Sequence, residues 1–202
     1  MNQILIVEAS PRGPESLSRA VSRTLALRLR AKFPEARLVY RDLTESAIPH
    51  PDAGTIKAIA SKNPEEAFPG HASARLSDEC TEELQSSDLL VIATPMWNFS
   101  IPSALKAWID LVVRPGRTFA YTEAGVQGLA KVKRAILIVA SGGVFTEGSW
   151  KPWDFAEPYL RRILSFIGIE DVQTVRAEGS NIPPLAGFTL PNAERAVAQL
   201  EL

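Results

Sequence analysis

Cysteine, net charge and long apolar runs are almost absent from this sequence. Its one cysteine, Cys80, rules out an internal disulfide framework. The 22 Lys plus Arg nearly balance the 23 Asp plus Glu, so a formal net charge of −1 provides no field for gathering nucleic acid. No apolar run approaches the roughly 20 residues that cross a bilayer, and residues 1–9 lack the pattern of a signal peptide. We therefore expect a cytoplasmic protein with no nucleic-acid partner and no membrane span.

Short apolar runs are present, and they alternate with helical patterns. Four runs are continuous and rich in Leu, Ile and Val, which is typical of parallel strands covered on both faces. A weaker run over residues 37–40 alternates apolar and polar side chains and predicts an edge strand. The alternation predicts an α/β fold with a doubly wound parallel sheet in one domain, residues 1–202. The four continuous runs are residues 4–7, 89–93, 135–140 and 172–177.

Helices are expected between these runs, several of them beginning at a proline. An apolar stripe at i+4 spacing starts at Leu17, and a second helix is expected over residues 76–87. Pro102, Pro158 and Pro191 are each expected in the first turn of a helix, where no backbone N–H is needed. Two stretches exceed the minimal unit and predict functional or mobile loops. They are residues 45–75 and 114–133.

The loop after the first strand carries hydroxyl groups at the start of a helix. Ser10, Arg12, Ser16 and Ser18 lie in it, and free amides with the helix dipole make a helix N-terminus a natural phosphate site. Ser16 fits the simpler role of a helix cap equally well. The loop lacks the spacing of a triphosphate P-loop, and the sequence has no G-x-G-x-x-G, so a phosphate monoester fits better than a pyrophosphate.

The loop after residues 89–94 contains large side chains where a turn normally uses Gly, Asp or Ser. Met96, Trp97 and Phe99 can flank a planar aromatic ligand, while Asn98 and the loop amides can bond to its polar edge. The alternative is a hydrophobic staple packed beneath the next helix. This sequence, Pro95 to Phe99, predicts that a ligand occupies the turn.

A third loop, at Ala140, Ser141, Gly142 and Gly143, follows the next strand. Paired glycines let backbone amides approach a ligand closely, although a plain turn explains them as well. Ligands in open α/β sheets bind beyond the carboxyl ends of the strands. Together the three loops predict a site for a phosphorylated flat heterocycle.

These residues resemble the FMN-dependent NADH:azo and quinone oxidoreductases, which are flavodoxin-like dimers. The resemblance covers nearly the whole chain, and its most specific element is the P-M-[YW]-N-F loop. Trp97 stands where many relatives have Tyr, and Ala140 where many have Ser, which leaves substrate range open without threatening cofactor binding. The motifs that carry the resemblance are Ser10, Ser16 to Ser18, Met96 to Phe99, residues 117–122, Ser141 to Gly143, residues 166–169 and residues 177–179.

The resemblance implies a flavodoxin-like sheet of order 2-1-3-4-5 with helices on both faces and inserted loops. It also implies non-covalent FMN, NADH or NADPH as the reductant, quinones and azo compounds as acceptors, and a homodimer. The first loop would hold the phosphate, the second the isoalloxazine and the glycine loop its pyrimidine side. The implied cofactor-binding residues are Ser10, Ser16, Leu17, Ser18, Pro95, Met96, Trp97, Asn98, Phe99, Ala140, Ser141, Gly142 and Gly143.

No side chain is expected to act as a catalyst, because FMN carries the redox chemistry at its N5. NADH and then the acceptor would use one pocket in turn, by a ping-pong mechanism. The pocket candidates are Asn98, Phe99, Phe119 and Tyr121, the last two open to the simpler reading of ordinary packing.

Other reactive side chains are expected to have structural roles. Cys80 is expected to be a buried structural thiol, and Glu8 and Asp110 are expected to make local hydrogen bonds or lie on a solvated face. His50 and His71 lie too far apart in the chain for a zinc motif, so no metal site is expected.

Two rival functions remain at this point. A flavodoxin-type electron carrier would bind FMN but pass single electrons to protein partners, for which the balanced charge gives little steering. A non-catalytic α/β phosphate-binding module would hold no flavin and leaves the aromatic loop unexplained.

Overall fold

The computed structural model describes residues 1–45, 48–61 and 72–202 and is built on a five-stranded parallel sheet. The strand order is β2-β1-β3-β6-β7, which is 2-1-3-4-5 when these five strands alone are counted. This confirms the expected flavodoxin-like architecture. The strands are β1 (Gln3–Glu8), β2 (Arg37–Asp42), β3 (Leu89–Pro95), β6 (Arg134–Ala140) and β7 (Asp171–Ala177).

Burial of the strands follows their place in the sheet. Every residue of the central strand β3 is buried, and so is every residue of β6 after Arg134, because helices cover both faces. Strand β2 pairs only with β1 and has no fully buried residue, as its alternating sequence predicts for an edge. The register is direct, with Ile4 opposite both Leu38 and Leu89.

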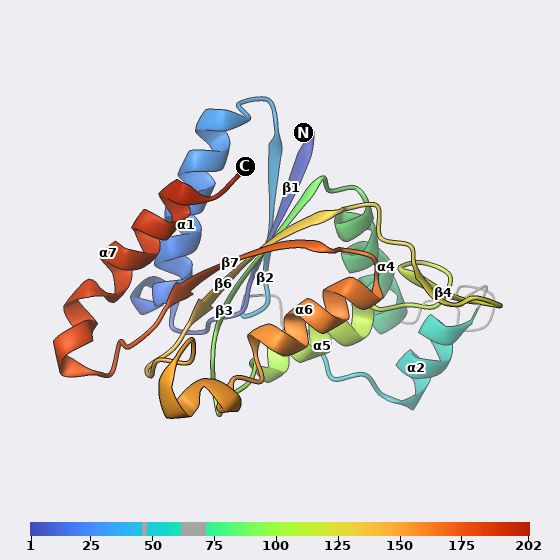
Figure 1. Ribbon diagram of the computed structural model, residues 1–202. Coiled ribbons are helices and arrows are strands. Elements are labelled where there is room, and N and C mark those ends of the chain that lie inside the picture. The colour runs from blue at the N-terminus through green and yellow to red at the C-terminus, as the bar shows by residue number, and fades with distance from the viewer. Residues whose placement is uncertain (46–47, 62–71) are drawn as a thin grey trace.

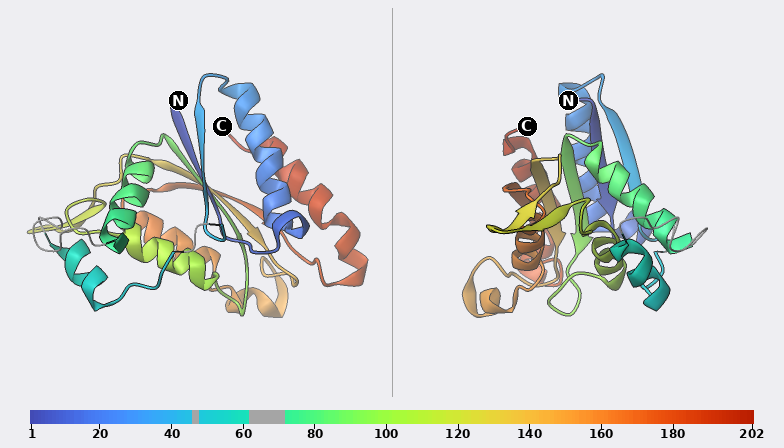
Figure 2. Two further views of the ribbon diagram at one scale, coloured as in Figure 1. Left: turned by 180° about the vertical axis from the view of Figure 1, so that it is seen from behind. Right: turned by 90° about the vertical axis from the view of Figure 1, so that its right-hand side faces the viewer.

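Helices form a layer on each face of the sheet (Figure 1 and Figure 2). One layer contains α1 (Leu17–Lys32) and α7 (Pro183–Gln199), which contact each other. The other contains α4 (Ala72–Gln85), α5 (Ser103–Val112) and α6 (Glu157–Phe166), with α2 (Ala53–Ala60) against α4. Each layer closes one apolar cluster against the sheet. No helix in the described part of the chain has both the length and the apolarity to span a bilayer.

The prolines mark helix starts in two of the three expected places. Pro158 is the second residue of α6, as predicted, whereas Pro102 lies one residue before α5, at its N-cap position and not in its first turn. The expectation for Pro191 is wrong, because α7 begins at Pro183 and Pro191 lies inside it. Pro183 and Pro184 occupy positions that need no N–H donor, so they begin the helix earlier than the sequence pattern indicated.

The two long stretches have different outcomes. Helix α2 lies within residues 45–75, and part of that stretch, including His71, lies outside the described residues. Residues 114–133 contain an antiparallel hairpin of β4 (Phe119–Thr122) and β5 (Gly125–Gly128). The hairpin is held where Gly128 touches Gly168, since a Cβ on Gly128 would lie 2.3 Å from the Gly168 nitrogen. Its first residue, Phe119, donates its N–H to the carbonyl of the buried Arg114 at 3.3 Å, and the Arg114 guanidinium bonds to Asp78 at 2.6 Å.

Candidate active site

Four loops meet at the carboxyl edge of the sheet, following β1, β3, β6 and β7. Backbone hydrogen bonds continue past the ends of the strands and set the direction of each loop. Ala9 donates to the Ala93 carbonyl at 3.0 Å, Met96 to that of Ala140 at 2.7 Å and Ser141 to that of Ala177 at 3.0 Å. The sequence predicted the first three loops at this edge; the fourth, after β7, carried no motif beyond its place in the resemblance.

The loop after β1 forms one side of a small cavity of about 150 Å³. Ser10, Ser16 and Ser18 are buried there, and the Ser16 and Ser18 hydroxyls lie 3.1 Å apart. Ser16 also accepts a hydrogen bond from the Arg19 backbone at 3.3 Å. It is therefore both the helix cap and a cavity residue, and its role in binding a phosphate stays a prediction. The cavity is lined by Ser10, Arg12, Ser16, Leu17, Ser18, Pro95, Met96, Trp97, Ala140, Ser141, Gly142, Ser180 and Asn181.

Arg19 fixes the position of this loop. Its Nε donates to the Ser10 carbonyl at 2.8 Å, while its Nη groups bond to Asp42 and to Glu8, both at 2.7 Å. Burial alone would raise the pKa of Asp42, but hydrogen bonds from Arg19 and Thr44 outweigh it and lower that pKa to about 2. The end of β1, the end of β2 and the start of α1 are thereby joined around one guanidinium. Glu8 accepts a hydrogen bond from Arg19, in line with the hydrogen-bonding role expected from the sequence.

The loop after β3 is a tight turn with two residues in the left-handed region. Trp97 and Ser100 exchange both backbone hydrogen bonds at 2.9 Å, and between them Asn98 has φ 47° and Phe99 φ 68°. This is the pattern of a type I′ turn, which favours Asn first and Gly second. Asn98 suits its position, whereas a phenylalanine at the second costs about 1 to 3 kcal/mol in backbone strain. The large side chains in this turn therefore need a compensating interaction.

An aromatic cluster supplies that compensation. The Phe99 ring lies 5.3 Å from Trp153, 5.8 Å from Trp150 and 6.2 Å from Phe145. The Phe155 backbone N–H donates to the Phe99 carbonyl at 2.9 Å. Each such ring pair contributes about 0.5 to 1.5 kcal/mol, enough together to offset the strain. The cluster joins the turn to the segment that includes the 3₁₀ helix η2 (Gly148–Trp153).

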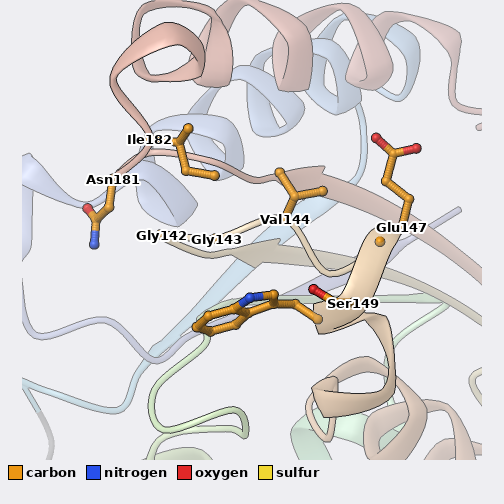
Figure 3. A pocket seen from close by; sticks show the side chains of 9 residues that line it. Gly142, Gly143, Val144, Glu147, Ser149, Asn181 and Ile182 are labelled. Atoms are coloured by element: carbon orange, nitrogen blue, oxygen red, sulfur yellow. The ribbon is translucent and has the colours of Figure 1, made fainter.

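The glycine loop after β6 borders a wider cavity of about 640 Å³. In Figure 3, Asn181 and Ile182 lie on one side of it, and Glu147 and Ser149 on the other. The amide N–H groups of Gly142 and Gly143 donate to no described residue, so both are free for a ligand. The lining consists of Gly142, Gly143, Val144, Glu147, Gly148, Ser149, Trp150, Asn181 and Ile182.

Some of the expected pocket residues do not line these cavities. Neither Asn98 nor Phe99 lines either cavity; Trp97, which precedes Asn98, lines the small cavity, and Trp150, which packs on Phe99, lines the wide one. Phe119 is packed 4.8 Å from the Phe166 ring, and Tyr121 is 76% exposed on the hairpin. The hairpin follows α5 and contacts α6 beside Gly168, just before β7 begins, so it lies at the opposite edge of the sheet (β4 in Figure 1). Within one chain, topology keeps both residues away from the site.

The remaining reactive side chains have structural roles. Cys80 is fully buried, and burial raises the pKa of its thiol to about 12, so it is an inert core residue as expected. Asp110 pairs with Lys106 one helical turn away at 2.7 Å. Among the described residues, no group of three or more His, Cys, Asp or Glu side chains lies close enough to hold a metal ion.

Comparison with known proteins agrees with this geometry. A family model described as "Flavodoxin-like fold" matches residues 2–200. The FMN-dependent NADH:quinone oxidoreductase of Beijerinckia indica subsp. indica is 60% identical over 202 residues and covers 100% of both chains. FMN-dependent NADH:quinone oxidoreductase 2 of Pseudomonas fluorescens is 44% identical over 186 residues, 90% of each chain. The chain belongs to the flavodoxin-like NADH:quinone oxidoreductase family.

Two solved azoreductase structures are similar to this chain. The crystal structure of azoreductase from Bacillus anthracis str. Sterne has a TM-score of 0.88 at 26% identity and covers 98% of both chains. An FMN-dependent NADH-azoreductase from Bacillus anthracis str. Ames Ancestor, in complex with FMN, has a TM-score of 0.83 at 28% identity, covering 98% of this chain and 96% of that one. Both likenesses cover nearly the whole of this chain.

Stability should depend on pH through Asp42. Its pKa in the folded protein is about 2, below the ordinary value of 3.8. Its contribution to the free energy of unfolding is therefore complete above about pH 4 and is lost as the pH falls through 2. We predict that Asp42→Asn lowers the free energy of unfolding at pH 6 by about 1 kcal/mol after solvent screening is allowed for. The difference from wild type should disappear near pH 2. Urea unfolding at both pH values measures it.

Asp110→Asn serves as the matched control, because it removes a carboxylate from a surface pair. If Asp42→Asn differed from wild type by the same amount at pH 6 and pH 2, the role given to the Arg19 contact would be wrong.

Proposed function

We propose that this protein is a cytoplasmic FMN-dependent NADH:quinone oxidoreductase that also cleaves aromatic azo compounds, with residues 1–202 as one FMN-binding domain. The observation that carries the proposal is the pair of adjoining cavities at the sheet edge, one small and lined with hydroxyls, the other wide and bordered by Trp150 and the glycine loop. The names of the similar proteins support the same activity. NADH is a cytoplasmic reductant, which supports the compartment.

The residues of the small cavity fit the phosphate end of FMN. The buried hydroxyls of Ser10, Ser16 and Ser18 are donors beside the first turn of α1, whose backbone amides and dipole favour an anion. Arg12 adds a positive charge at the cavity wall. The loop after β1 has no glycine-rich turn that could hold a second phosphate group, so a phosphate monoester fits this cavity better than a pyrophosphate.

The wider cavity fits the flavin ring and a flat substrate. Its volume of about 640 Å³ lies within the usual range of roughly 300 to 1,000 Å³ for small-molecule sites. Met96 and Trp97 border the smaller cavity where the ring would enter, and Trp150 offers a half-exposed aromatic face. The remaining proposed cofactor contacts are Leu17, Pro95, Asn98, Phe99, Ala140, Ser141, Gly142 and Gly143.

Bound FMN supplies the two-electron redox chemistry between NADH and the acceptor. The chain's residues bind and orient the reactants instead of reacting themselves. The free N–H groups of Gly142 and Gly143 are placed to donate to an electron-rich ring edge, and their positions are already fixed before charge develops. Ser141 holds this arrangement by donating its hydroxyl to the Gly143 carbonyl at 2.8 Å.

The open cavity favours an enzyme over an electron carrier, because a small flat acceptor can enter it. We predict that the purified protein loaded with FMN oxidises NADH at about 1 to 1,000 turnovers per second when a water-soluble quinone is present. One quinone should be consumed for each NADH. The rate is followed by NADH absorbance. A flavin that NADH reduces only over minutes, with or without quinone, would favour the electron carrier.

Asn98 offers a test of the turn in this reaction. We predict that Asn98→Gly slows reduction of the bound flavin by NADH about 2- to 10-fold, because the side-chain amide loses one hydrogen bond to the ring edge. Glycine accepts the φ of 47° without strain, so the variant keeps its melting temperature. Asn98→Ala should slow the step equally but also melt lower. Stopped-flow absorbance gives the rate, and an unchanged single-turnover rate removes Asn98 from the mechanism.

We also propose that the protein is a homodimer in which one subunit's hairpin lies against the aromatic cluster of the other. Trp153 and Phe155 are each 54% exposed beside the wider cavity, and Tyr121 and Val126 project from the hairpin. Aromatic side chains are enriched in such interfaces. This arrangement brings Tyr121, supported by Phe119 at 5.4 Å, to a cavity that it does not reach within its own chain.

Replacing Tyr121 and Val126 together by Lys should convert the dimer to monomers, because two charges would be buried in an apolar contact. Light scattering after gel filtration measures the mass. Leu27→Lys is the matched control, since Leu27 is an exposed apolar residue on α1. A wild-type protein that runs as a monomer at every concentration contradicts the proposal.

A further inference from the structure

The loop after β7 is attached to the glycine loop through backbone hydrogen bonds. Gly179 donates to the Gly143 carbonyl and Asn181 to the Gly142 carbonyl, both at 3.0 Å. Ser180 adds a contact from its hydroxyl to the Ser141 carbonyl at 3.2 Å. These bonds fix the backbone of Asn181 relative to the residues proposed to hold the cofactor, and they thereby fix the position from which its side chain extends.

The Asn181 side chain lies directly against Gly142. A Cβ on Gly142 would fall 2.5 Å from the Asn181 Nδ2, so any other residue at position 142 would displace this amide. Figure 3 shows the two residues side by side at one end of the wider cavity. They are also the two residues that line both cavities. A ligand that extends from the small cavity to the wide one has to pass the Asn181 amide.

This amide has no structural task among the described residues. Its side chain makes no hydrogen bond with any of them, and helix α7, which begins two residues later, has no side-chain cap. An asparagine at a helix start normally caps it, but the first two helical residues here, Pro183 and Pro184, have no N–H to donate. The two N–H donors and the carbonyl of Asn181 therefore remain available to a ligand.

We propose that the Asn181 amide binds the ribityl hydroxyls of FMN and selects a polyhydroxyl chain between phosphate and ring. The inference rests on the proposed function and adds a contact from the loop after β7, which contributes none of the cofactor contacts proposed above. A hydroxyl group both donates and accepts, so it can accept a hydrogen bond from the Asn181 NH₂ group or donate one to its carbonyl oxygen. The ribityl chain joins the phosphate to the ring, and Asn181 lies where the two cavities join.

Affinity for two flavins tests the proposal. The flavin-free protein is titrated with FMN, and with a flavin phosphate whose linking chain carries no hydroxyls, while flavin fluorescence is followed. Asn181→Ala and Asn181→Leu should each weaken FMN binding about 3- to 10-fold, the loss expected for one neutral hydrogen bond. Both variants should bind the hydroxyl-free flavin as wild type does. Asn192→Ala, which removes an exposed amide from α7, should leave both affinities unchanged.

Three results would overturn the proposal. Wild-type affinity for FMN in both Asn181 variants removes the contact. An equal loss for both flavins shows that Asn181 only shapes the glycine loop. If the wild-type protein retains neither flavin, the proposed function itself fails, and this outcome is distinct from the other two because it appears before any substitution is made.

Discussion

The left-handed turn between Trp97 and Ser100 is the constraint around which the site is arranged. A phenylalanine at φ 68° is unfavourable by itself, and it persists because Phe145, Trp150 and Trp153 pack on its ring while Phe155 bonds to its carbonyl. The same contacts hold η2 against the turn. The strained loop and the wall of the wider cavity therefore stabilise each other, and each would lose its position without the other.

A second set of contacts fixes the opposite end of the site. Arg19 bonds to the Ser10 carbonyl and to two carboxylates on β1 and β2, so the hydroxyl loop is held by the sheet as well as by α1. The loops after β6 and β7 are joined to each other by backbone bonds. All of these contacts are made within the chain, so they position the four loops through protein groups alone. Such preorganisation is what a protein contributes to a reaction whose chemistry belongs to a cofactor.

Much of the fold could be predicted because strands buried on both faces have a continuous apolar sequence. The runs that became β3 and β6 are covered on both faces, so they are continuous and apolar. The prediction that Pro191 begins a helix was wrong because the sequence does not distinguish a proline at a helix start from one within a helix. Phe119 and Tyr121 could not be placed, since their distance from the cavities depends on where α5 ends in space. Asn181 carried no signal, because its place depends on backbone hydrogen bonds between the loop after β6 and the loop after β7, which no motif in the sequence connects.

The absorption spectrum of the protein after FMN is added and excess removed tests the central claim most directly, when recorded anaerobically before and after NADH. We predict a retained flavin spectrum that bleaches with NADH and returns with a quinone. Retention without bleaching would leave the fold and the hydroxyl cavity in place but contradict the enzyme. No retained flavin would contradict the assignment of the loops after β1, β3 and β6 as a cofactor site.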